Sequence, residues 1–288
     1  MRRCIRCERS FDSHGWVCPA CGFAPDAVGS IARFATPVGR DGFDPDAFDR
    51  LAELEHRSFW FRSRNLLIGW AVGHYFPEAR SFLEIGCGTG FVLEGLRRMC
   101  PDLSLLGADL HIGGLMHACR RMPDVGLLQL DARQLPFEAE FDVIGAFDVL
   151  EHIDDDETVL AEIHRAVRPG GGIVLTVPQH PSLWSASDDY GEHKRRYSRA
   201  ELVSKATAVG FAVRRVSSFV TLLLPAMAVM RLRGRVARAR VDPVREHVIA
   251  QRVSRPLELM LGLERSLIAR GADLPIGGSL LLVAQRRA

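Results

Sequence analysis

Four cysteines within the first 21 residues have the spacing of a metal site. Cys4 and Cys7 form one C-x-x-C pair, Cys18 and Cys21 form a second, and ten residues separate the pairs. Two such turns can place four thiolates tetrahedrally around a zinc ion. A segment of about 25 residues buries too little apolar surface to fold unaided, so we expect a structural zinc ion with no open coordination position. Two metal-free pairs, reduced or disulfide-linked, are the alternative.

A glycine turn in the middle of the chain could approach a ligand closely. The stretch LEIGCGTGF, residues 83–91, places Gly86, Gly88 and Gly90 just after Glu84. Glycine can adopt backbone dihedrals that are closed to other residues. The G-x-G-x-G spacing, without G-K-[ST], matches neither the dinucleotide fingerprint nor the phosphate loop. An acidic residue beneath the glycines suits an amine or a sulfonium better than a phosphate.

Three carboxylates follow the next apolar runs of the chain. Asp109 ends LLGAD, Asp131 follows LLQL, and Asp148 follows FDVIGAF. Asp109 lies 19 residues beyond Gly90, where a carboxylate can accept both hydroxyls of a ribose. Together with the glycine turn, the three would line one crevice that suits a ribose, an amine and a positive centre, and that repels a pyrophosphate. Taken singly, each carboxylate could instead cap a helix.

The alternation of apolar and helical segments predicts how these residues are positioned. Apolar runs that are buried on both faces and joined by helical crossovers form a parallel sheet. Ser198 and Glu201 form a capping box that opens a further helix, which Gly210 closes. Strands are expected at residues 81–85, 103–110, 126–130, 141–150, 172–177, 211–219 and 279–287, and helices at residues 91–99, 114–122 and 156–167.

Two regions fall outside this alternation. Residues 26–74 are predicted to be a Gly-, Pro- and Asp-rich linker followed by one or two helices. Residues 220–278 form an insert before the last strand, in which the apolar stretch FVTLLLPAMAVM leads into a basic run. This insert could be a helical lid over the crevice, a dimer contact or a membrane-facing surface. The basic run contains Arg231, Arg233, Arg235, Arg238 and Arg240.

Composition limits the location and the partners. The chain has 288 residues, of which 47% are hydrophobic and 25% charged, as in a globular protein with one large domain and attachments. A net charge of +2 gives no bias toward nucleic acid. The N-terminus lacks the apolar core of a signal peptide, and no stretch reaches the roughly 18 apolar residues of a bilayer span. We expect a cytoplasmic protein, with peripheral membrane contact through the insert left open.

In their order and spacing, five motifs resemble the class I S-adenosylmethionine-dependent methyltransferases. They are LEIGCGTG, GADL, DARQLPF, FDVIGAFDVLEHI and VRPGGGIVLTVP, and the resemblance covers residues 50–219 and 279–288. GEHKRRYS resembles an element of the small-molecule, ubiquinone-biosynthesis-like subgroup. The implied fold is α/β, with a Rossmann-like, mostly parallel seven-stranded sheet flanked by helices. We expect a zinc ribbon in residues 1–25, a methyltransferase domain in residues 75–219 plus 279–288, and a helical insert before the last strand.

The resemblance also implies which residues bind S-adenosylmethionine. They are Glu84, Gly86, Cys87, Gly88, Gly90, Asp109, Leu110, Asp131, Ala132, Phe147 and Asp148. In the family, the first five positions hold the methionine part of the cofactor, and the position of Asp109 binds the ribose hydroxyls. Asp131 with Ala132 would hold the adenine, and the last two residues would lie near the reacting methyl group.

Methyl transfer is an in-line displacement, so the protein must align the acceptor and remove any proton that the acceptor carries. His193 is the candidate base, with Tyr197 beside it and Asp148 near the methyl group. His193 could instead only pack and hydrogen-bond its loop. A divalent ion could lie on Asp148, Glu151 and His152, although the sequence favours a role at the start of a helix.

These observations predict a methyltransferase that acts on a small-molecule or lipid-like acceptor. Arg62 or Arg64 could pair with the cofactor carboxylate, and Trp60 and Phe61 could close the pocket. One alternative is an RNA base methyltransferase that grips RNA with its zinc ribbon, although no N-P-P-Y-type motif follows the fourth strand. A second alternative is a non-catalytic scaffold that binds S-adenosylmethionine. The glycine spacing disfavours a dehydrogenase, and nothing in the sequence indicates the oligomeric state.

Overall fold

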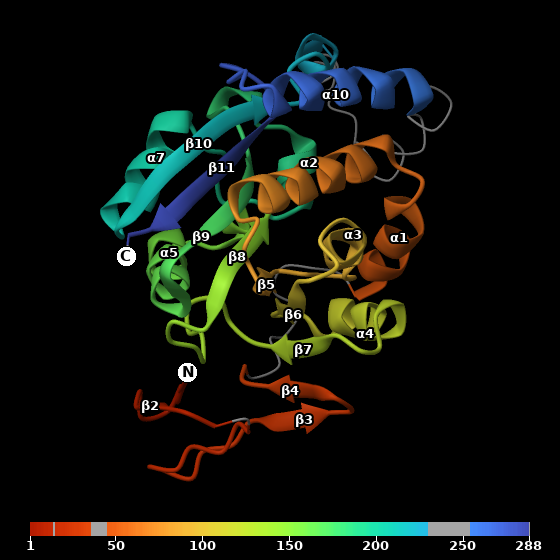
Figure 1. Cartoon of the computed structure of the whole chain (residues 1–288). Coiled ribbons are helices and arrows are strands. Elements are labelled where there is room, and N and C mark those ends of the chain that lie inside the picture. The colour runs from red at the N-terminus through yellow and green to blue at the C-terminus, as the bar shows by residue number, and fades with distance from the viewer. Residues whose placement is uncertain (14, 36–44, 230–253, 288) are drawn as a thin grey trace.

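The computed structural model describes residues 1–13, 15–35, 45–229 and 254–287, and its centre is a nine-stranded sheet (Figure 1). The strand order is β10-β11-β9-β8-β5-β6-β7-β4-β3. The strands are β3 (Asp26–Val28), β4 (Ile31–Arg33), β5 (Ser81–Ile85), β6 (Ser104–Asp109), β7 (Gly126–Gln129), β8 (Phe141–Phe147), β9 (Val167–Pro178), β10 (Phe211–Phe219) and β11 (Ser279–Arg286). The helices are α1 (Pro45–Glu55), α2 (Phe59–Tyr75), α3 (Phe91–Met99), α4 (Ile112–Arg121), α5 (Asp156–Ala166), α6 (Ala186–Tyr190), α7 (Arg199–Ala208) and α10 (Ser254–Ala269).

Strand β5 lies at the point where the strand order changes direction. It pairs in parallel with β6 on one side and with β8 on the other, while β11 runs antiparallel to both β9 and β10. In open parallel sheets, ligands bind outside the carboxyl ends of the strands at such a switch point. The end of β5 is the glycine turn, so the topology places the turn where a ligand would bind.

Both faces of the sheet are covered, which explains why its strands are almost wholly apolar. Phe82 and Leu83 of β5 are both fully buried, although adjacent strand residues point to opposite faces. Helices α5 and α7 pack into the cluster that contains Leu83. Helices α2, α3, α4 and α10 pack into the cluster that contains Phe82 (Figure 1). The expected α/β fold, a mostly parallel Rossmann-like sheet flanked by helices, is confirmed.

Residues 26–33 are not the linker that the sequence analysis predicted. Strands β3 and β4 form a hairpin around Gly29, which has a φ of 60°, and β4 pairs in parallel with β7. Ile31 of this hairpin is 1% exposed and packs into the apolar core. The seven expected strands are all present, and the hairpin extends their sheet by two. Three-residue strands are too short to show a hydrophobic period, so the pattern in the sequence did not reveal them.

Two stretches of the insert are helical within the described residues, and turns and irregular chain flank them. Residues 224–229 are helical, and α10 packs against α2, where Arg62 forms a bidentate pair with Glu258 at 3.0 and 2.7 Å. The basic run of the insert lies outside the described residues. Among the helices of the described part of the chain, none is long and apolar enough to cross a bilayer.

Candidate functional site

The glycine turn between β5 and α3 requires glycine for steric reasons. Gly86, Gly88 and Gly90 have φ angles of 69°, 50° and 78°. A Cβ atom on Gly86 would lie 2.3 Å from the side chain of Val149. The Cys87 N–H donates to the carbonyl of Ala108 at 3.0 Å, which ties the turn to the end of β6. The backbone of the turn is therefore held in place at the end of the sheet.

Glu84 is a buried acid at the base of this turn. Its side chain is 2% exposed, and its Oε2 atom has no hydrogen-bond partner in the described part of the chain. Burial raises the pKa of Glu84 well above its usual value, an effect that the nearby Arg64 guanidinium opposes. A buried carboxylate with a free oxygen fits a cationic group such as the amine of S-adenosylmethionine.

Asp109 is fixed against the glycine turn at the end of β6. Its two oxygens accept hydrogen bonds of 2.8 Å from the N–H groups of Gly88 and His111. Burial raises the pKa of the carboxyl group, and these N–H donors act against that shift. Leu110 follows directly, and its carbonyl accepts from the Gln129 side chain at 2.9 Å. The carboxylate expected to hold a ribose thus has a defined orientation at the switch point.

Asp131 follows β7 and is paired within its own loop. Its carboxylate accepts from the backbone and side-chain nitrogens of Arg133, with Nε at 3.0 Å from Oδ1. This partner lowers the pKa of Asp131 even though burial acts in the opposite sense. The next residue, Ala132, is 8% exposed. The residues expected to hold the adenine therefore lie in a loop braced by an ion pair.

Asp148 lies at the end of β8, where the chain turns sharply. It has a φ of 58°, and its carboxylate pairs with Arg64 from α2. The Arg64 guanidinium lies 4.5 Å from the centre of the Trp60 ring. Phe147, directly before it, is buried. Of the two arginines considered from the sequence, Arg64 lies at the site, whereas Arg62 binds α10.

Helix α1 also covers the turn, which the sequence analysis did not foresee. The Thr89 hydroxyl donates to Glu55 at 2.6 Å, and Arg121 donates to the same carboxylate at 2.9 Å. Phe48 of α1 lies 4.0 Å from where a Cβ of Gly88 would be. Glu55 is 4% exposed, although its position in the sequence resembles that of a solvated helix residue. No local pattern in the sequence could have revealed these contacts, because they join segments 30 to 70 residues apart.

His193 lies beside the ends of β8 and β9, in contact with two groups that orient it. Its Nδ1 atom lies 3.0 Å from Asp188 Oδ1, and its ring meets the His152 ring edge-on with the centroids 4.7 Å apart. Asp188 is 1% exposed and also accepts from Arg196 Nε at 2.7 Å. The His193 and Arg196 partners hold the pKa of Asp188 far below its usual range against the effect of burial. Asp188 is an orienting residue that the sequence analysis missed.

Glu151 and His152 complete this group. Glu151 is fully buried, and neither of its carboxylate oxygens has a hydrogen-bond partner among the residues described. Burial and then repulsion from His193 lower the pKa of His152 to about 4. Glu151, His152 and His193 offer ligand atoms within 4.8 Å of one another, so a divalent ion would lie on His193 rather than on Asp148. Glu151 and His152 are the last two residues of a short 3-10 helix, Leu150–His152, rather than the start of a helix.

Tyr197 does not join the site. Its side chain is fully buried, and its hydroxyl donates to Asp156 of α5 at 2.6 Å. Asp156 in turn pairs with Lys205 of α7 at 2.6 Å. Burial followed by the Asp156 contact raises the pKa of Tyr197 far above its usual value. The tyrosine thus links α5 and α7 within the core, which indicates a structural role for its hydroxyl rather than the predicted catalytic one.

The four N-terminal cysteines converge as the spacing predicts. The Cys4 and Cys21 sulfurs are 3.5 Å apart, those of Cys7 and Cys18 are 3.7 Å apart, and all four lie within 4.8 Å of one another. Cys4 and Cys18 are buried. These distances and the all-thiolate donor set fit a tetrahedral zinc ion with Zn–S bonds of about 2.3 Å.

Comparisons with known proteins agree with this geometry. A family model described as a methyltransferase domain matches residues 83–175, which contain the turn, Asp109, Asp131 and Asp148. The chain thus contains a methyltransferase domain. A probable S-adenosylmethionine-dependent methyltransferase of Mycolicibacterium smegmatis is 28% identical to the chain, over 56% of this chain and 62% of the relative. A ubiquinone biosynthesis O-methyltransferase of Paracidovorax citrulli is 30% identical, over 46% of this chain and 61% of the relative.

Solved structures resemble the methyltransferase domain in fold. One is a complex between the Haloferax volcanii Trm112 methyltransferase activator and a putative methyltransferase, with a TM-score of 0.56 and 19% identity over 85% of this chain and 97% of that chain. Another is a Haemonchus contortus phosphoethanolamine N-methyltransferase with S-adenosylmethionine, with a TM-score of 0.52 and 20% identity over 78% of this chain and 52% of that chain. At these identities the likeness shows the fold alone.

The new role of Tyr197 can be tested by Tyr197→Phe. The change removes a buried hydrogen bond to a carboxylate, so we expect the free energy of unfolding in urea to fall by about 1–3 kcal/mol. Cofactor affinity should not change. Tyr190→Phe, at an exposed position, is the matched control. If Tyr197→Phe leaves the stability unchanged but abolishes methyl transfer, Tyr197 has a catalytic role instead.

Proposed function

We propose that the protein transfers the methyl group of S-adenosylmethionine to a small-molecule or lipid-like acceptor. The observation that carries this proposal is the pair of buried acids, Glu84 and Asp109, at a glycine turn within a matched methyltransferase domain. Relatives that are O-methyltransferases of ubiquinone biosynthesis favour a small-molecule acceptor. The chain spans less than two thirds of the length of those relatives. The proposed activity therefore rests on the residues of this chain.

Different residues of the site would bind the cofactor and remove the proton of the acceptor. When bound, S-adenosylmethionine supplies a methyl group on a positively charged sulfur. Glu84 would neutralise its amine, and Asp109 would accept from its ribose hydroxyls. His193, oriented by Asp188, would remove the proton of the acceptor, since neutral imidazole is the usual proton carrier near neutral pH. Arg64, which pairs with Asp148, would also lie close enough to bind the carboxylate of S-adenosylmethionine.

Cofactor binding is tested by Asp109→Asn. We expect the affinity for S-adenosylhomocysteine, measured by titration calorimetry, to fall at least about tenfold, because a charge-assisted hydrogen bond is lost. Asp102→Asn, which changes an exposed carboxylate before the same strand, should leave the affinity unchanged. A wild-type protein that binds neither S-adenosylmethionine nor S-adenosylhomocysteine would refute the proposed function.

Transfer itself is tested with radiolabelled S-adenosylmethionine and a cell extract, from which the labelled product is identified. With that acceptor, His193→Ala should lower kcat by about 10²–10⁴ while cofactor affinity stays the same. His74→Ala, at an exposed position in α2, is the control. Intact cofactor binding with no labelled product would favour the scaffold alternative, and labelled RNA would favour the RNA methyltransferase.

We also propose that the four cysteines hold a structural zinc ion. Metal analysis of freshly reduced protein should give about one zinc ion per chain. The double variant Cys7→Ser/Cys21→Ser should lose it, whereas Cys119→Ser, outside the cluster, should retain it. Protein purified under reducing conditions with no bound metal would contradict this proposal.

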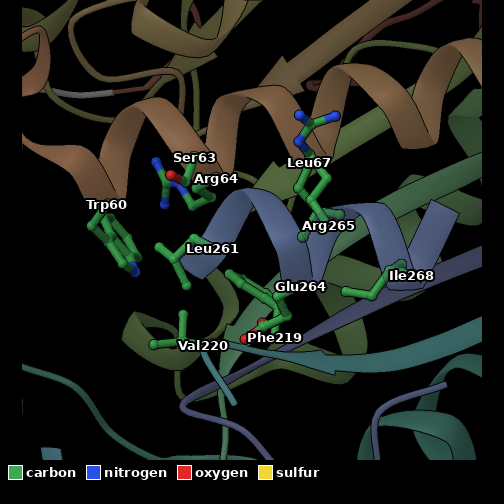
Figure 2. A pocket seen from close by; sticks show the side chains of 10 residues that line it. All are labelled: Trp60, Ser63, Arg64, Leu67, Phe219, Val220, Leu261, Glu264, Arg265 and Ile268. Carbon is green, nitrogen blue, oxygen red and sulfur yellow. The ribbon is translucent and has the colours of Figure 1, made fainter. Parts of the chain in front are cut away.

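We further propose that the insert favours an apolar acceptor and contacts a membrane surface peripherally. Figure 2 shows α2 and α10 facing each other across a small pocket whose lining mixes apolar side chains, such as those of Trp60 and Leu261, with the charged Glu264 and Arg265. Arg64 lines the same pocket and pairs with Asp148, so the pocket adjoins the site.

The outward face of α10 has the chemistry of a membrane-facing helix. Leu259, Leu263 and Leu267 form an exposed row along it, with side chains 75%, 57% and 40% exposed. Both carboxylates of α10 are engaged elsewhere: Glu258 pairs with Arg62, and Glu264 accepts from backbone N–H groups. The exposed charges on the helix and directly after it, Arg255 and Arg270, are therefore positive, as suits an anionic lipid surface.

Vesicle sedimentation tests this surface. Leu259→Ser/Leu263→Ser should lower binding to phosphatidylglycerol vesicles by at least about tenfold, since each buried leucine contributes about 1.5–3 kcal/mol. Cofactor affinity should not change, and Met116→Ser, an exposed apolar residue of α4, is the control. A wild-type protein that does not bind the vesicles would exclude the membrane contact, and concentration-dependent dimers that the double variant lacks would indicate a dimer contact instead.

A further inference from the structure

The loop between β7 and β8, which carries Asp131 and Ala132, is held from outside by the N-terminal segment. We call residues 1–35 the cysteine module. The Arg3 N–H donates to the Pro136 carbonyl at 3.0 Å, and the Gln134 side chain donates to the Ile5 carbonyl at 2.8 Å. The Glu138 N–H donates to the Met1 carbonyl at 3.0 Å. Three hydrogen bonds thus fix a loop that would otherwise present free backbone groups to solvent.

An aromatic contact fixes the same loop. The Phe137 ring, fully buried, meets the Trp16 ring edge-on with centroids 5.8 Å apart. The Arg2 guanidinium lies 4.0 Å from the centre of the Trp16 ring, and Trp16 also packs on Phe34 at 4.8 Å. Contacts of this kind add to the energy of area burial. The module therefore contacts the loop through both backbone and side-chain groups.

The hairpin of the module reaches the ribose side of the site through Gln129. Its side-chain oxygen accepts from Arg33 Nε at 2.9 Å, and its nitrogen donates to the Leu110 carbonyl at 2.9 Å. The Phe34 N–H donates to the Gln129 carbonyl at 2.7 Å. Gln129 is 3% exposed, and it is followed by Leu130 and then Asp131. One buried amide thus joins the module to the ends of both β6 and β7.

The cysteines hold the residues that make these contacts. Ile5, whose carbonyl accepts from Gln134, lies between Cys4 and Cys7, and Trp16 lies two residues before Cys18. The module has few buried apolar residues of its own around the cysteines, so the metal would supply its order. Without that order, the loop would have to be fixed when the cofactor binds, which lowers affinity.

We propose that the cysteine module is a working part of the cofactor site: by fixing residues 131–138, it raises the affinity for the adenosine end of the cofactor when its metal is bound. Gln134 and Trp16 are positioning residues in this arrangement. This inference rests on the proposed function, because it assigns the adenine to the loop of Asp131 and Ala132.

The test measures dissociation constants of the full chain for S-adenosylhomocysteine and for 5′-methylthioadenosine, which lacks the amino acid part. Gln134→Leu should weaken both ligands equally, by about three- to tenfold, because one hydrogen bond to the module is lost. Gln285→Leu is the matched control, since it removes a similar amide-to-carbonyl bond to Gly170 at the far side of the sheet. Zinc content should be unchanged in both variants.

Metal removal and one further variant complete the test. Cys7→Ser/Cys21→Ser should lower the affinity for both ligands by at least tenfold. Glu84→Gln should lower the affinity for S-adenosylhomocysteine alone, because Glu84 would contact the amine that 5′-methylthioadenosine lacks. Equal affinities in wild type, Gln134→Leu and zinc-free protein would overturn the inference while leaving the proposed function intact. If the zinc-free chain unfolds in thermal melts, Gln134→Leu decides alone. Wild-type protein that binds neither ligand would instead refute the proposed function.

Discussion

The constraint on which the site depends is the burial of acids beneath a backbone turn. Moving a carboxylate out of water is costly unless hydrogen bonds or an opposite charge compensate. Asp109 receives that compensation from the N–H groups of Gly88 and His111. Glu84 receives it only in part: Arg64 and the backbone at Leu93 oppose the effect of burial, and within the described residues its Oε2 atom has no hydrogen-bond partner. The fold thus buries an acid whose ionised form is only partly compensated, and a cationic ligand beside it would favour that form and gain affinity from the resulting ion pair.

Segments that lie far apart in the sequence provide this arrangement. The domain match covers residues 83–175, yet α1, α2 and the hairpin all contact the turn or the strands that carry the acids. Arg64 of α2 joins the acids to the pocket beside α10. Contacts from outside the matched segment therefore hold the glycine turn, Asp148 and the strand before Asp131, and α2 and α10 line the pocket beside them.

Much of this could be predicted from sequence because the signals were local. The strand at 81–85 and the helix at 91–99 were predicted to the residue, since an apolar run, a glycine turn and an amphipathic period lie next to one another. Tyr197 was misplaced because proximity in sequence to His193 does not fix the direction of a side chain. The partners Asp188 and Glu55 were missed because their burial depends on contacts far along the chain. The strand at 31–33 was missed because it is short.

The position of the hairpin also affects how the protein behaves at high concentration. Without the hairpin, β7 would be the edge of the sheet, and the unpaired N–H and C=O groups of an edge strand can pair with a second molecule. Strand β4 occupies that edge, and the new outer strand β3 has only three residues and begins with the charged Asp26. A strand this short gives a neighbouring chain little to pair with. At this edge of the sheet, the hairpin therefore limits pairing with a second molecule.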